Sequence, residues 1–300
     1  MPELPEVETV RARLEPALVG RRFVRVRIDD PRLVRPLEPR EVAAELEGER
    51  VAAVERRGKY LVFRFESGRV LLIHLRMTGS LRHAPGGTLQ DDPHRRAVVT
   101  LDDGSDVAYR DVRRFGTWLL VESGELDPYL AARLGEEPLG AAFTTTALRS
   151  RLAGRRAPVK AALLDQRTLA GMGNIYVDEA LWRARLHPLR PARELDANDV
   201  RRLHTGIRRA LEAGIARQGA TLRDYATPDG GRGSMQEEFK VYGRDGEPCV
   251  RCGTPIEKIR VAGRGTWFCP SCQPLGPVEE AQAASRSSRR PSRSSSRSSL

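Results

Sequence analysis

The sequence lacks the long apolar segments that mark membrane and exported proteins. Within its 300 residues, no apolar run approaches the roughly twenty residues that a membrane-spanning helix needs. The N-terminal stretch is acidic and has no apolar core of the kind found in a secretory signal. We therefore expect a cytoplasmic protein with no membrane partner. Cysteine is also scarce, with four residues, and cytoplasmic cysteines rarely form disulfides.

Acidic residues are missing from one end of the chain. Overall, 51 Lys and Arg stand against 40 Asp and Glu, which gives a net charge of +11. Such a surplus favours a polyanion, nucleic acid first, as the partner. Residues 281–300 hold five arginines and no acid, so the rest of the chain carries only +6 (11 − 5). The charge is therefore also compatible with a surplus that serves solubility alone.

The spacing of apolar residues changes along the chain and predicts two kinds of architecture. Over 4–18 they recur every three or four positions, which predicts a helix with Pro5 in its first turn. Short alternating segments follow up to 121 and are typical of a β-sandwich or barrel. The helical period returns over 147–214, after a connecting segment at 125–140. The expected strands are 23–28, 51–65 around Gly58-Lys59-Tyr60, 70–75, 98–101, 107–109 and 118–121, and the expected helices include 159–166, 175–185 and 200–213.

Three segments have a composition of their own. The turn Gly171-Met172-Gly173-Asn174 precedes a helix and can point backbone donors at an anion. Residues 218–234 are rich in glycine and polar side chains and predict a long loop, a frequent place for function, although a plain linker fits equally well. Residues 281–300 repeat Ser and Arg, cannot bury a core and are expected to be disordered. Their arginines can add non-specific attraction to phosphate.

The first residues contain an unusual amine. Once Met1 is removed, Pro2 becomes the first residue and its nitrogen becomes a secondary amine. Such an amine can attack an electrophilic sugar carbon and form an iminium ion, which splits one difficult step into two easier ones. A carboxylate, Glu3, follows at once. Proline at the second position is common and by itself indicates only methionine removal, so this hypothesis needs support from the rest of the chain.

All four cysteines stand in two short pairs. Cys249 and Cys252 form the first pair, and Cys269 and Cys272 follow after sixteen residues. Two pairs at this separation fit a tetrahedral four-thiolate zinc site. No open coordination position or adjacent general base is evident, so we expect one structural zinc ion, which a module of this size needs to fold. We expect two strands between the pairs. Their basic residues are suited to phosphate contact and are Lys258, Arg260 and Arg264.

Further short motifs lie between the proline and the cysteines. They are Gly58-Lys59-Tyr60-Leu61, His74-Leu75-Arg76-Met77-Thr78-Gly79, Asp111-Val112-Arg113-Arg114-Phe115-Gly116, Leu163-Leu164-Asp165-Gln166, Gly173-Asn174-Ile175-Tyr176, Val241-Tyr242-Gly243-Arg244 and Gly263-Arg264-Gly265-Thr266. With the opening Pro2-Glu3-Leu4-Pro5-Glu6-Val7-Glu8 and the four-cysteine ribbon, these blocks resemble bacterial formamidopyrimidine-DNA glycosylase in order and spacing. The resemblance covers 1–273 and leaves out the segment from Pro274 onward.

The resemblance implies an α+β fold of several domains. These are an N-terminal β-sandwich with a leading helix, a helix-two-turn-helix domain and a C-terminal zinc ribbon. DNA would run through a positively charged cleft between the domains. The implied divisions are 1–124 for the catalytic β-sandwich, 125–146 for a linker, 147–234 for the helix-two-turn-helix domain with a lesion loop, 235–275 for the zinc ribbon and 276–300 for a disordered Ser/Arg tail.

The implied activity is a bifunctional DNA glycosylase and abasic-site lyase of base excision repair. Its substrate is damaged double-stranded DNA with an oxidised purine, above all 8-oxoguanine opposite cytosine and formamidopyrimidines. Excision would proceed through a Schiff base on the N-terminal proline and be followed by β,δ-elimination. The implied protein is a monomer, cytoplasmic and associated with the nucleoid through DNA.

The resemblance also implies roles for individual residues. The catalytic set is Pro2 as nucleophile, Glu3 as acid, Lys59 for β-elimination and Arg264 for δ-elimination, the last two equally plausible as phosphate clamps. Met77 and Phe115 would fill the gap left by the extruded nucleotide, and Arg113 would face the orphaned cytosine. By hydrophobicity alone, Met77 and Phe115 would be core residues. The other implied DNA contacts are His74, His94, Arg155 or Arg156, Lys160, Asn174 and Tyr242.

Two alternatives remain at this point. Endonuclease VIII-like glycosylases, which act on oxidised pyrimidines, share the proline chemistry, but they typically begin Pro-Glu-Gly-Pro-Glu and this chain begins Pro-Glu-Leu-Pro-Glu. The Arg-Arg-Phe block also favours the purine branch. A zinc-ribbon DNA-binding protein without catalysis fits the charge and the cysteines equally well. Pro2, Glu3 and Lys59 separate the two, since a protein that only binds DNA does not need them.

Overall fold

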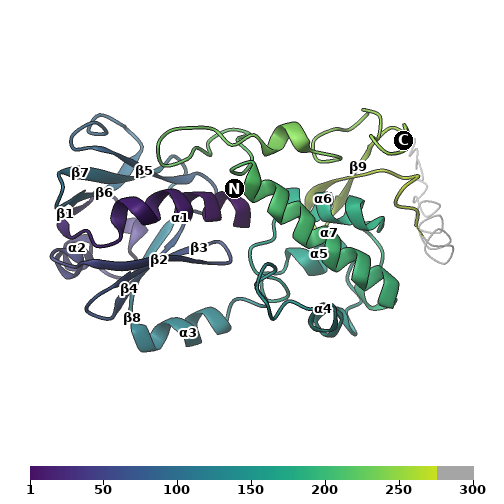
Figure 1. Ribbon diagram of the computed structural model, residues 1–300, viewed down its shortest axis with the longest axis horizontal. Helices are drawn as coiled ribbons and strands as arrows, with labels where there is room; N and C mark the ends of the chain where they lie inside the picture. Colours follow the sequence, from purple (N-terminus) through teal and green to yellow (C-terminus); the bar gives the residue numbers. More distant parts are fainter. Residues whose placement is uncertain (276–300) are drawn as a thin grey trace, which may run out of the picture.

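The computed structural model describes residues 1–275. The predicted Ser/Arg tail at 276–300 lies outside the described residues. Figure 1 shows a sheet-rich lobe on the left and a helical lobe on the right, with the N-terminus between them. No helix in the described part of the chain is long and apolar enough to cross a membrane.

The first helix, α1 (Leu4–Leu18), follows the predicted apolar stripe. Glu3 and Glu6 form a capping box at its start, and proline occupies its first turn, where no backbone donor is needed. Leu4 packs in the core of the helical lobe, whereas Val7 and the apolar residues after it pack in the core of the sheet lobe. The beginning of α1 therefore joins the two lobes and brings the N-terminus to the seam between them.

Two four-stranded antiparallel sheets form the first lobe and confirm the predicted β-sandwich. Their inward-facing apolar residues, together with α1, make up one core. The first sheet has the order β1 (Phe23–Ile28), β6 (Arg95–Leu101), β7 (Ser105–Asp111), β5 (Gly79–Pro85), and the second has the order β2 (Val51–Arg57), β3 (Tyr60–Phe65), β4 (Arg69–His74), β8 (Thr117–Glu122).

Several elements of this lobe were not expected from the periodicity. They are the 3-10 turn η1 (Pro31–Leu33), α2 (Pro39–Leu46), β5 and α3 (Ser123–Ala131). The last lies largely in the segment interpreted as a connection. It is a helix because Leu126 and Leu130 cover Val62, Val70 and Leu72 on the outer face of the second sheet. Tertiary burial, rather than a strong local period, stabilises this helix.

The helical lobe confirms the predicted helices at 159–166, 175–185 and 200–213, with small shifts at their ends. It contains α4 (Thr145–Leu152), α5 (Val159–Leu164), α6 (Asn174–Ala184), η2 (Ala192–Glu194) and α7 (Ala197–Ala216). These helices share one apolar core. The segment 218–234 forms a loop with a single bridge between Ala220 and Ser234, as predicted, and leads to η3 (Met235–Glu238).

The C-terminal module consists of the antiparallel pair β9 (Glu257–Val261) and β10 (Arg264–Phe268), as the sequence predicts. Its small core contains Trp182 of α6 together with Cys249 and Cys269. The carboxylate of Asp178, also on α6, accepts a hydrogen bond from the Trp267 backbone amide at 3.1 Å. Helix α6 thus holds the module against the helical lobe.

Candidate active site and nucleic-acid interface

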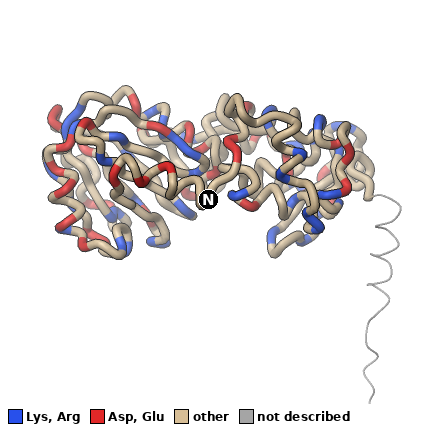
Figure 2. The backbone as a smooth tube through the Cα atoms, turned by 90° about the horizontal axis from the view of Figure 1, so that it is seen from below, with Lys and Arg blue, Asp and Glu red and all other residues tan. Residues whose placement is uncertain are grey.

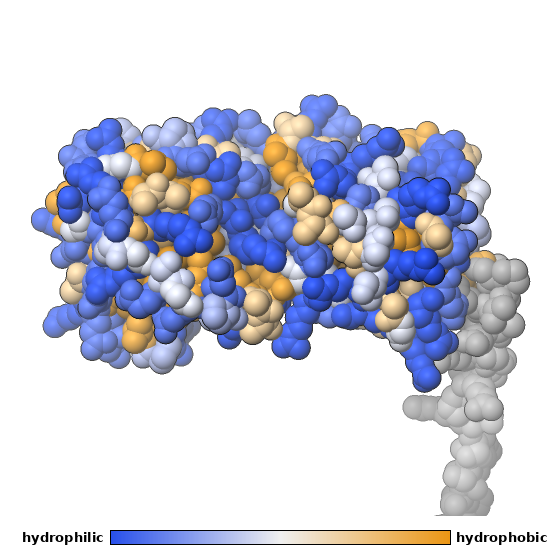
Figure 3. Space-filling model, turned by 60° about the horizontal axis from the view of Figure 1, so that its bottom comes forward, coloured by the Kyte–Doolittle hydropathy of each residue, from blue (hydrophilic) through white to orange (hydrophobic). Residues whose placement is uncertain are grey.

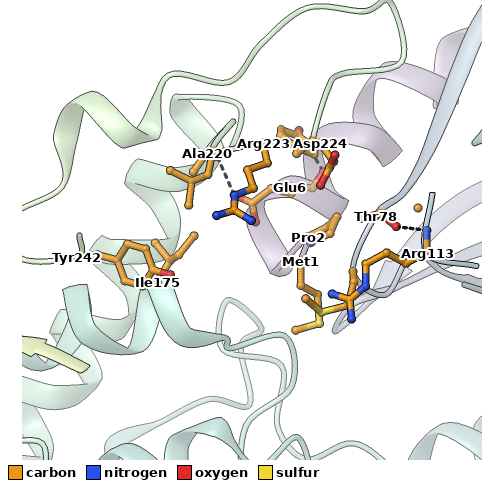
Figure 4. Close-up of a pocket in the computed structure, with 14 residues that line it drawn as sticks. Met1, Pro2, Glu6, Thr78, Arg113, Ile175, Ala220, Arg223, Asp224 and Tyr242 are labelled. Carbon is orange, nitrogen blue, oxygen red and sulfur yellow. Dashed lines mark hydrogen bonds between the residues drawn. The ribbon is translucent and has the colours of Figure 1, made fainter. Parts of the chain in front are cut away.

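A cavity of about 400 Å³ opens at the N-terminus. Figure 4 shows Pro2 at its centre, with Thr78 and Arg113 of the sheet lobe on one side, and Ile175 of the helical lobe and Tyr242 near the zinc module on the other. The loop after α7 closes a further side through Ala220 and through Leu222, Arg223, Asp224 and Tyr225. Pro2 therefore lines a space enclosed by both lobes and the loop, where it is buried beneath the exposed Met1.

Glu3 lies beside Pro2 and is only 3% exposed. Its carboxylate accepts hydrogen bonds from the backbone amides of Ile175 (3.0 Å) and Tyr176 (3.3 Å) at the start of α6. The backbone donors at the start of α6, directly after the glycine turn, therefore bind a carboxyl group of the protein itself. Burial raises the pKa of Glu3, while the nearby Lys59 opposes this rise. A carboxyl group with a raised pKa is suited to act as a general acid.

Gly173, immediately before α6, makes this contact possible. A Cβ atom at this position would lie 2.2 Å from the carboxyl carbon of Glu3. Only glycine leaves space for the carboxylate to reach the helix N-terminus, where the helix dipole favours negative charge.

Glu6 ties the N-terminus to the loop after α7. Its carboxylate accepts hydrogen bonds from the Glu3 backbone amide, the Tyr176 hydroxyl and the Ala220 backbone amide, each at 2.8 Å. The side chain is 2% exposed. In the structure it stands in the first turn and also connects three segments of the site.

Lys59 follows Gly58 in the turn between β2 and β3 and is 5% exposed. Burial lowers the pKa of Lys59, Glu3 and Glu6 counteract this effect, and Arg264 adds to it. An amine with a lowered pKa can lose its proton and act as a base. Gly58 has a positive φ of 58° and packs closely against Ala170 and Gly171, so the helical lobe fixes the turn that carries Lys59.

Arg264 starts β10 and is exposed. The next residue is anchored twice, since the Gly265 carbonyl accepts from Lys160 Nζ (3.0 Å) and from Asn174 Nδ2 (2.9 Å). Lys160 also pairs with Asp178 at 2.7 Å, with both side chains fully buried. Lys160 therefore lies behind the site and supports the zinc hairpin, and its assignment as a DNA contact stays a prediction. Asn174 performs the same support from the N-terminus of α6.

Three side chains expected to enter DNA stand on two neighbouring loops of the sheet lobe. Met77 lies between β4 and β5 and lines the cavity. Arg113 and Phe115 lie between β7 and β8, with the Arg113 guanidinium 4.7 Å above the centre of the Phe115 ring. Phe115 is 53% exposed, which confirms that it is outside the core. An exposed aromatic ring capped by a cation is available for stacking on a nucleobase.

The remaining predicted DNA contacts are dispersed. His74 ends β4, where its Nδ1 accepts from the Arg76 amide at 3.0 Å, and burial lowers its pKa to about 3, so the ring is neutral at pH 7. His94 precedes β6 and is partly exposed. Arg155 pairs with Asp165 at 3.1 Å. Arg156 is exposed and has no ion pair among residues 1–275, so it is the freer of the two arginines.

Tyr242 lines the cavity from the side of the zinc module. Its ring contacts the rings of Phe239 and Trp267, with centroid separations of 5.4 and 4.5 Å. Lys and Arg positions occur on both lobes around the N-terminus (Figure 2), and the face seen in Figure 3 is mostly hydrophilic. This distribution is compatible with a phosphate backbone that contacts both lobes.

The four cysteines converge as the spacing predicts, with their sulfur atoms all within 4.8 Å of one another. Cys249 Sγ accepts hydrogen bonds from Trp182 Nε1 (3.4 Å) and from the Arg251 amide (3.5 Å), and the Cys272 amide donates to Cys269 Sγ (3.3 Å). Donors directed at sulfur stabilise thiolates, the form that binds zinc. The donor set therefore fits one structural zinc ion.

Some residues of this site were missed by sequence reasoning. Thr78, Asp111 and Tyr176 occur in the short motifs without a role of their own, and the cavity-lining residues 222–225 lie in the predicted loop without being singled out. Their roles depend on contacts between segments that are far apart in the chain.

Comparison with known proteins agrees with this geometry. The formamidopyrimidine-DNA glycosylase N-terminal domain matches residues 1–118, the formamidopyrimidine-DNA glycosylase H2TH domain matches 134–226, and the zinc finger found in FPG and IleRS matches 246–275. The formamidopyrimidine-DNA glycosylase of Symbiobacterium thermophilum is 49% identical over 294 residues, which cover 98% of this chain and 95% of that protein. That of Thermus thermophilus is 46% identical over 280 residues, covering 92% of this chain and all of that protein.

Solved structures show the same architecture. A Lactococcus lactis FPG mutant in complex with DNA containing Fapy-dG has a TM-score of 0.86 and 39% identity, and covers 91% of this chain and 100% of that one. The MutM (FPG) protein of Thermus thermophilus has a TM-score of 0.82 and 45% identity, and covers 92% and 100%. The fold, the zinc finger and the enclosed N-terminal site are those of a DNA repair glycosylase. The chain belongs to the formamidopyrimidine-DNA glycosylase family.

Proposed function

We propose that this chain excises oxidised purines, 8-oxoguanine and formamidopyrimidines, from duplex DNA and then cleaves the strand, using the nitrogen of Pro2 after Met1 has been removed. The observation that carries the proposal is the position of Pro2. It lies at the centre of a cavity between both lobes, directly beside a carboxyl group with a raised pKa. A protein that only binds DNA needs neither feature.

In the first step, the lone pair of the Pro2 nitrogen attacks C1′ of the extruded nucleotide. The bond between C1′ and the base breaks, its electron pair leaves with the base, and the base takes up the proton that the Pro2 nitrogen releases. The nitrogen lone pair then forms the C=N bond of the iminium ion while the bond between C1′ and the ring oxygen breaks, and Glu3 protonates that oxygen. The N-terminus of α1 disfavours positive charge and so keeps the Pro2 amine available as a neutral nucleophile.

In the second step, the iminium ion makes the C2′ proton acidic. Lys59, whose pKa is lowered by burial, takes this proton, and the 3′ phosphate leaves by β-elimination. Arg264 holds the phosphate through the following δ-elimination. Its guanidinium acts there as a cation rather than as a proton donor, because an arginine does not lose its proton near neutral pH. The zinc ion would be held by the four cysteines and has a structural part only.

Access to C1′ requires extrusion of the damaged nucleotide from the duplex. Met77 and Phe115 enter the space that it leaves, and Arg113 faces the unpaired cytosine. His74, His94, Arg156, Asn174 and Tyr242 contact the backbone and set the register without reading sequence. The loop 218–234 covers the extruded base, since its residues 222–225 line the cavity.

Borohydride trapping tests the proposal. The zinc-loaded protein without Met1 should become covalently attached to a duplex with 8-oxoguanine opposite cytosine, and Pro2→Gly should trap far less while still shifting the duplex in a gel. A folded wild-type sample that binds the duplex but does not trap would contradict catalysis by Pro2.

The same assay separates the purine and pyrimidine branches. A second duplex with thymine glycol in the same sequence serves as the competing substrate. We expect faster excision of 8-oxoguanine, because the relatives are formamidopyrimidine-DNA glycosylases. Faster excision of thymine glycol would assign the chain to the endonuclease VIII-like alternative.

We further propose that the protein acts as a cytoplasmic monomer, with functional divisions at 1–124, 125–146, 147–234 and 235–275. A single polypeptide contributes every side chain of the cavity, so no second copy is needed to complete it. Light scattering of the free protein and of its complex with one lesion duplex should give one protein chain in each case. A dimer in the complex would contradict this proposal.

A further inference from the structure

Asp111 is a buried carboxylate that no chemical step of the proposed reaction uses. It ends β7 and is 1% exposed. A buried carboxylate is costly unless its oxygen atoms are satisfied by hydrogen bonds. The partners of Asp111 therefore show what the charge stabilises.

Its two oxygen atoms connect the two loops that carry the DNA-entering side chains. Oδ1 accepts from the Thr78 hydroxyl (2.5 Å) and from the Arg113 amide (3.2 Å), and Oδ2 accepts from the Gly116 amide (2.8 Å). The Thr78 oxygen in turn accepts from the Arg113 amide at 3.0 Å. Thr78 follows Met77, and Gly116 follows Phe115. One carboxylate thus holds both loops at positions adjacent to the side chains that would enter DNA.

The ring of Tyr109 gives these loops a common support. A Cβ atom at Gly79 would lie 2.3 Å from the Tyr109 hydroxyl oxygen, and one at Gly116 would lie 1.6 Å from it. Each loop therefore ends on a glycine packed against the same buried hydroxyl group. Tyr109 lies on the same strand as Asp111, two residues before it.

A further contact holds the second loop from outside. Arg114, between Arg113 and Phe115, has a positive φ of 59° and donates two hydrogen bonds to Asp30, at 2.5 and 2.9 Å. A left-handed arginine is strained and persists only where its surroundings determine it. The loop is therefore fixed on both sides of Arg113 before any DNA arrives.

We propose that Asp111 is a positioning residue that joins the Met77 loop and the Arg113–Phe115 loop into one rigid wedge for extruding the damaged nucleotide. This inference rests on the proposed function, because it assigns the wedge to the extrusion step. Preorganised side chains avoid the entropy cost of ordering during insertion. Loss of the carboxylate should therefore slow extrusion more than the chemistry at C1′.

The test compares Asp111→Asn with Asp106→Asn. Asp106 lies on the same strand, is 8% exposed and has equivalent partners, since it accepts from the Gly87 amide (2.9 Å) and the Thr100 hydroxyl (2.8 Å), but neither partner belongs to the cavity. Both variants lose a buried charge, and only one loses the connection between the loops. Melting temperatures and zinc content establish that each variant is folded.

Two substrates are used under single-turnover conditions. The first is a duplex with 8-oxoguanine opposite cytosine, and the second is a duplex with a preformed abasic site, which has no base to unstack. We expect Asp111→Asn to slow excision from the first about tenfold or more, with abasic-site cleavage changed by less than about twofold. 2-Aminopurine next to the lesion should report slower unstacking. Asp106→Asn should leave both rates near the wild-type values.

Equal rates of Asp111→Asn and wild type on the first duplex, or equal slowing on both duplexes, would overturn the inference. If Asp111→Asn does not fold, Thr78→Val takes its place, because it removes the hydroxyl link while keeping the shape of the side chain. This variant must then excise 8-oxoguanine more slowly while cleaving the abasic-site duplex at nearly the wild-type rate. Failure of the proposed function would look different, since the wild type itself would then process neither duplex.

Discussion

The contact between Glu3 and the start of α6 leads to a sharp prediction for Gly173→Ala. The new Cβ atom would lie 2.2 Å from the Glu3 carboxyl carbon and 2.5 Å from one of its oxygen atoms, so the two cannot coexist. Gly173 has a φ of −135°, which alanine adopts without strain. The consequence is therefore steric, and the group that must move is the end of a flexible side chain.

The magnitude follows from which group moves. Because Glu3 can rotate away, the fold should lose only about 1 to 3 kcal/mol of unfolding free energy, typical of a moderate steric conflict in a core. The displaced carboxyl group loses its two backbone donors and its place beside Pro2. Positioned acids typically contribute 10²- to 10⁴-fold, so the excision rate should fall about a hundredfold or more.

Single-turnover excision of 8-oxoguanine, with a melting curve for each protein, measures both effects. Gly124→Ala is the matched control, since Gly124 stands in the first turn of α3 and a Cβ atom there would meet nothing within 4 Å. This control should excise normally and be slightly more stable, as alanine is favoured over glycine in helices. Wild-type excision by a folded Gly173→Ala protein would refute the role of the contact.

Three other predictions concern charge and metal. Burial raises the pKa of Glu3, so the folded state favours its protonated form. The free energy of unfolding of wild type, relative to Glu3→Gln, should therefore fall as pH rises above the ordinary carboxyl pKa of 4.5. Denaturant titrations at several pH values check the direction of this change. Lys160→Met should destabilise the protein by about 3 to 5 kcal/mol by leaving the Asp178 carboxylate unpaired, and an added Asp178→Leu should recover much of the loss in the same melts. Removal of zinc with a chelator should unfold the C-terminal module, and the substitution Cys269→Ser should have the same effect. A protein that has lost all its zinc but keeps its tryptophan fluorescence and its lesion binding would contradict this prediction.

The elements that the sequence predicted well are those with a strong local signal. The helix over 4–18, the strands of the sandwich and the two zinc-binding pairs follow from periodicity and spacing, and the structure confirms them. Helix α3 was missed because it contains Pro128 and its apolar residues are stabilised by the outer face of a sheet. The local sequence of α3 has only a weak helical period, and burial against the sheet stabilises the helix.

The candidate site shows the same division. Pro2, Glu3 and Lys59 were identified by type and resemblance, and the structure places all three at or beside one cavity. Lys160 was predicted as a DNA contact, which stays a prediction, and the structure adds that its side chain is fully buried and donates to the Gly265 carbonyl. Sequence position alone does not distinguish a lysine that contacts a ligand from one that supports the loop next to it.

The sequence by itself determined the groups available for chemistry: a proline next to the initiator methionine, a carboxylate after it, and four cysteines at zinc-binding spacing. Only the tertiary structure decided how these groups are tuned. Glu3 meets the Ile175 amide across 172 residues of chain, and Asp111 joins loops that are 35 residues apart. The burial and hydrogen bonding of a side chain depend on such distant contacts. The pKa shift of Glu3 and the rigidity of the two loops therefore come from tertiary contacts rather than from neighbours in the chain.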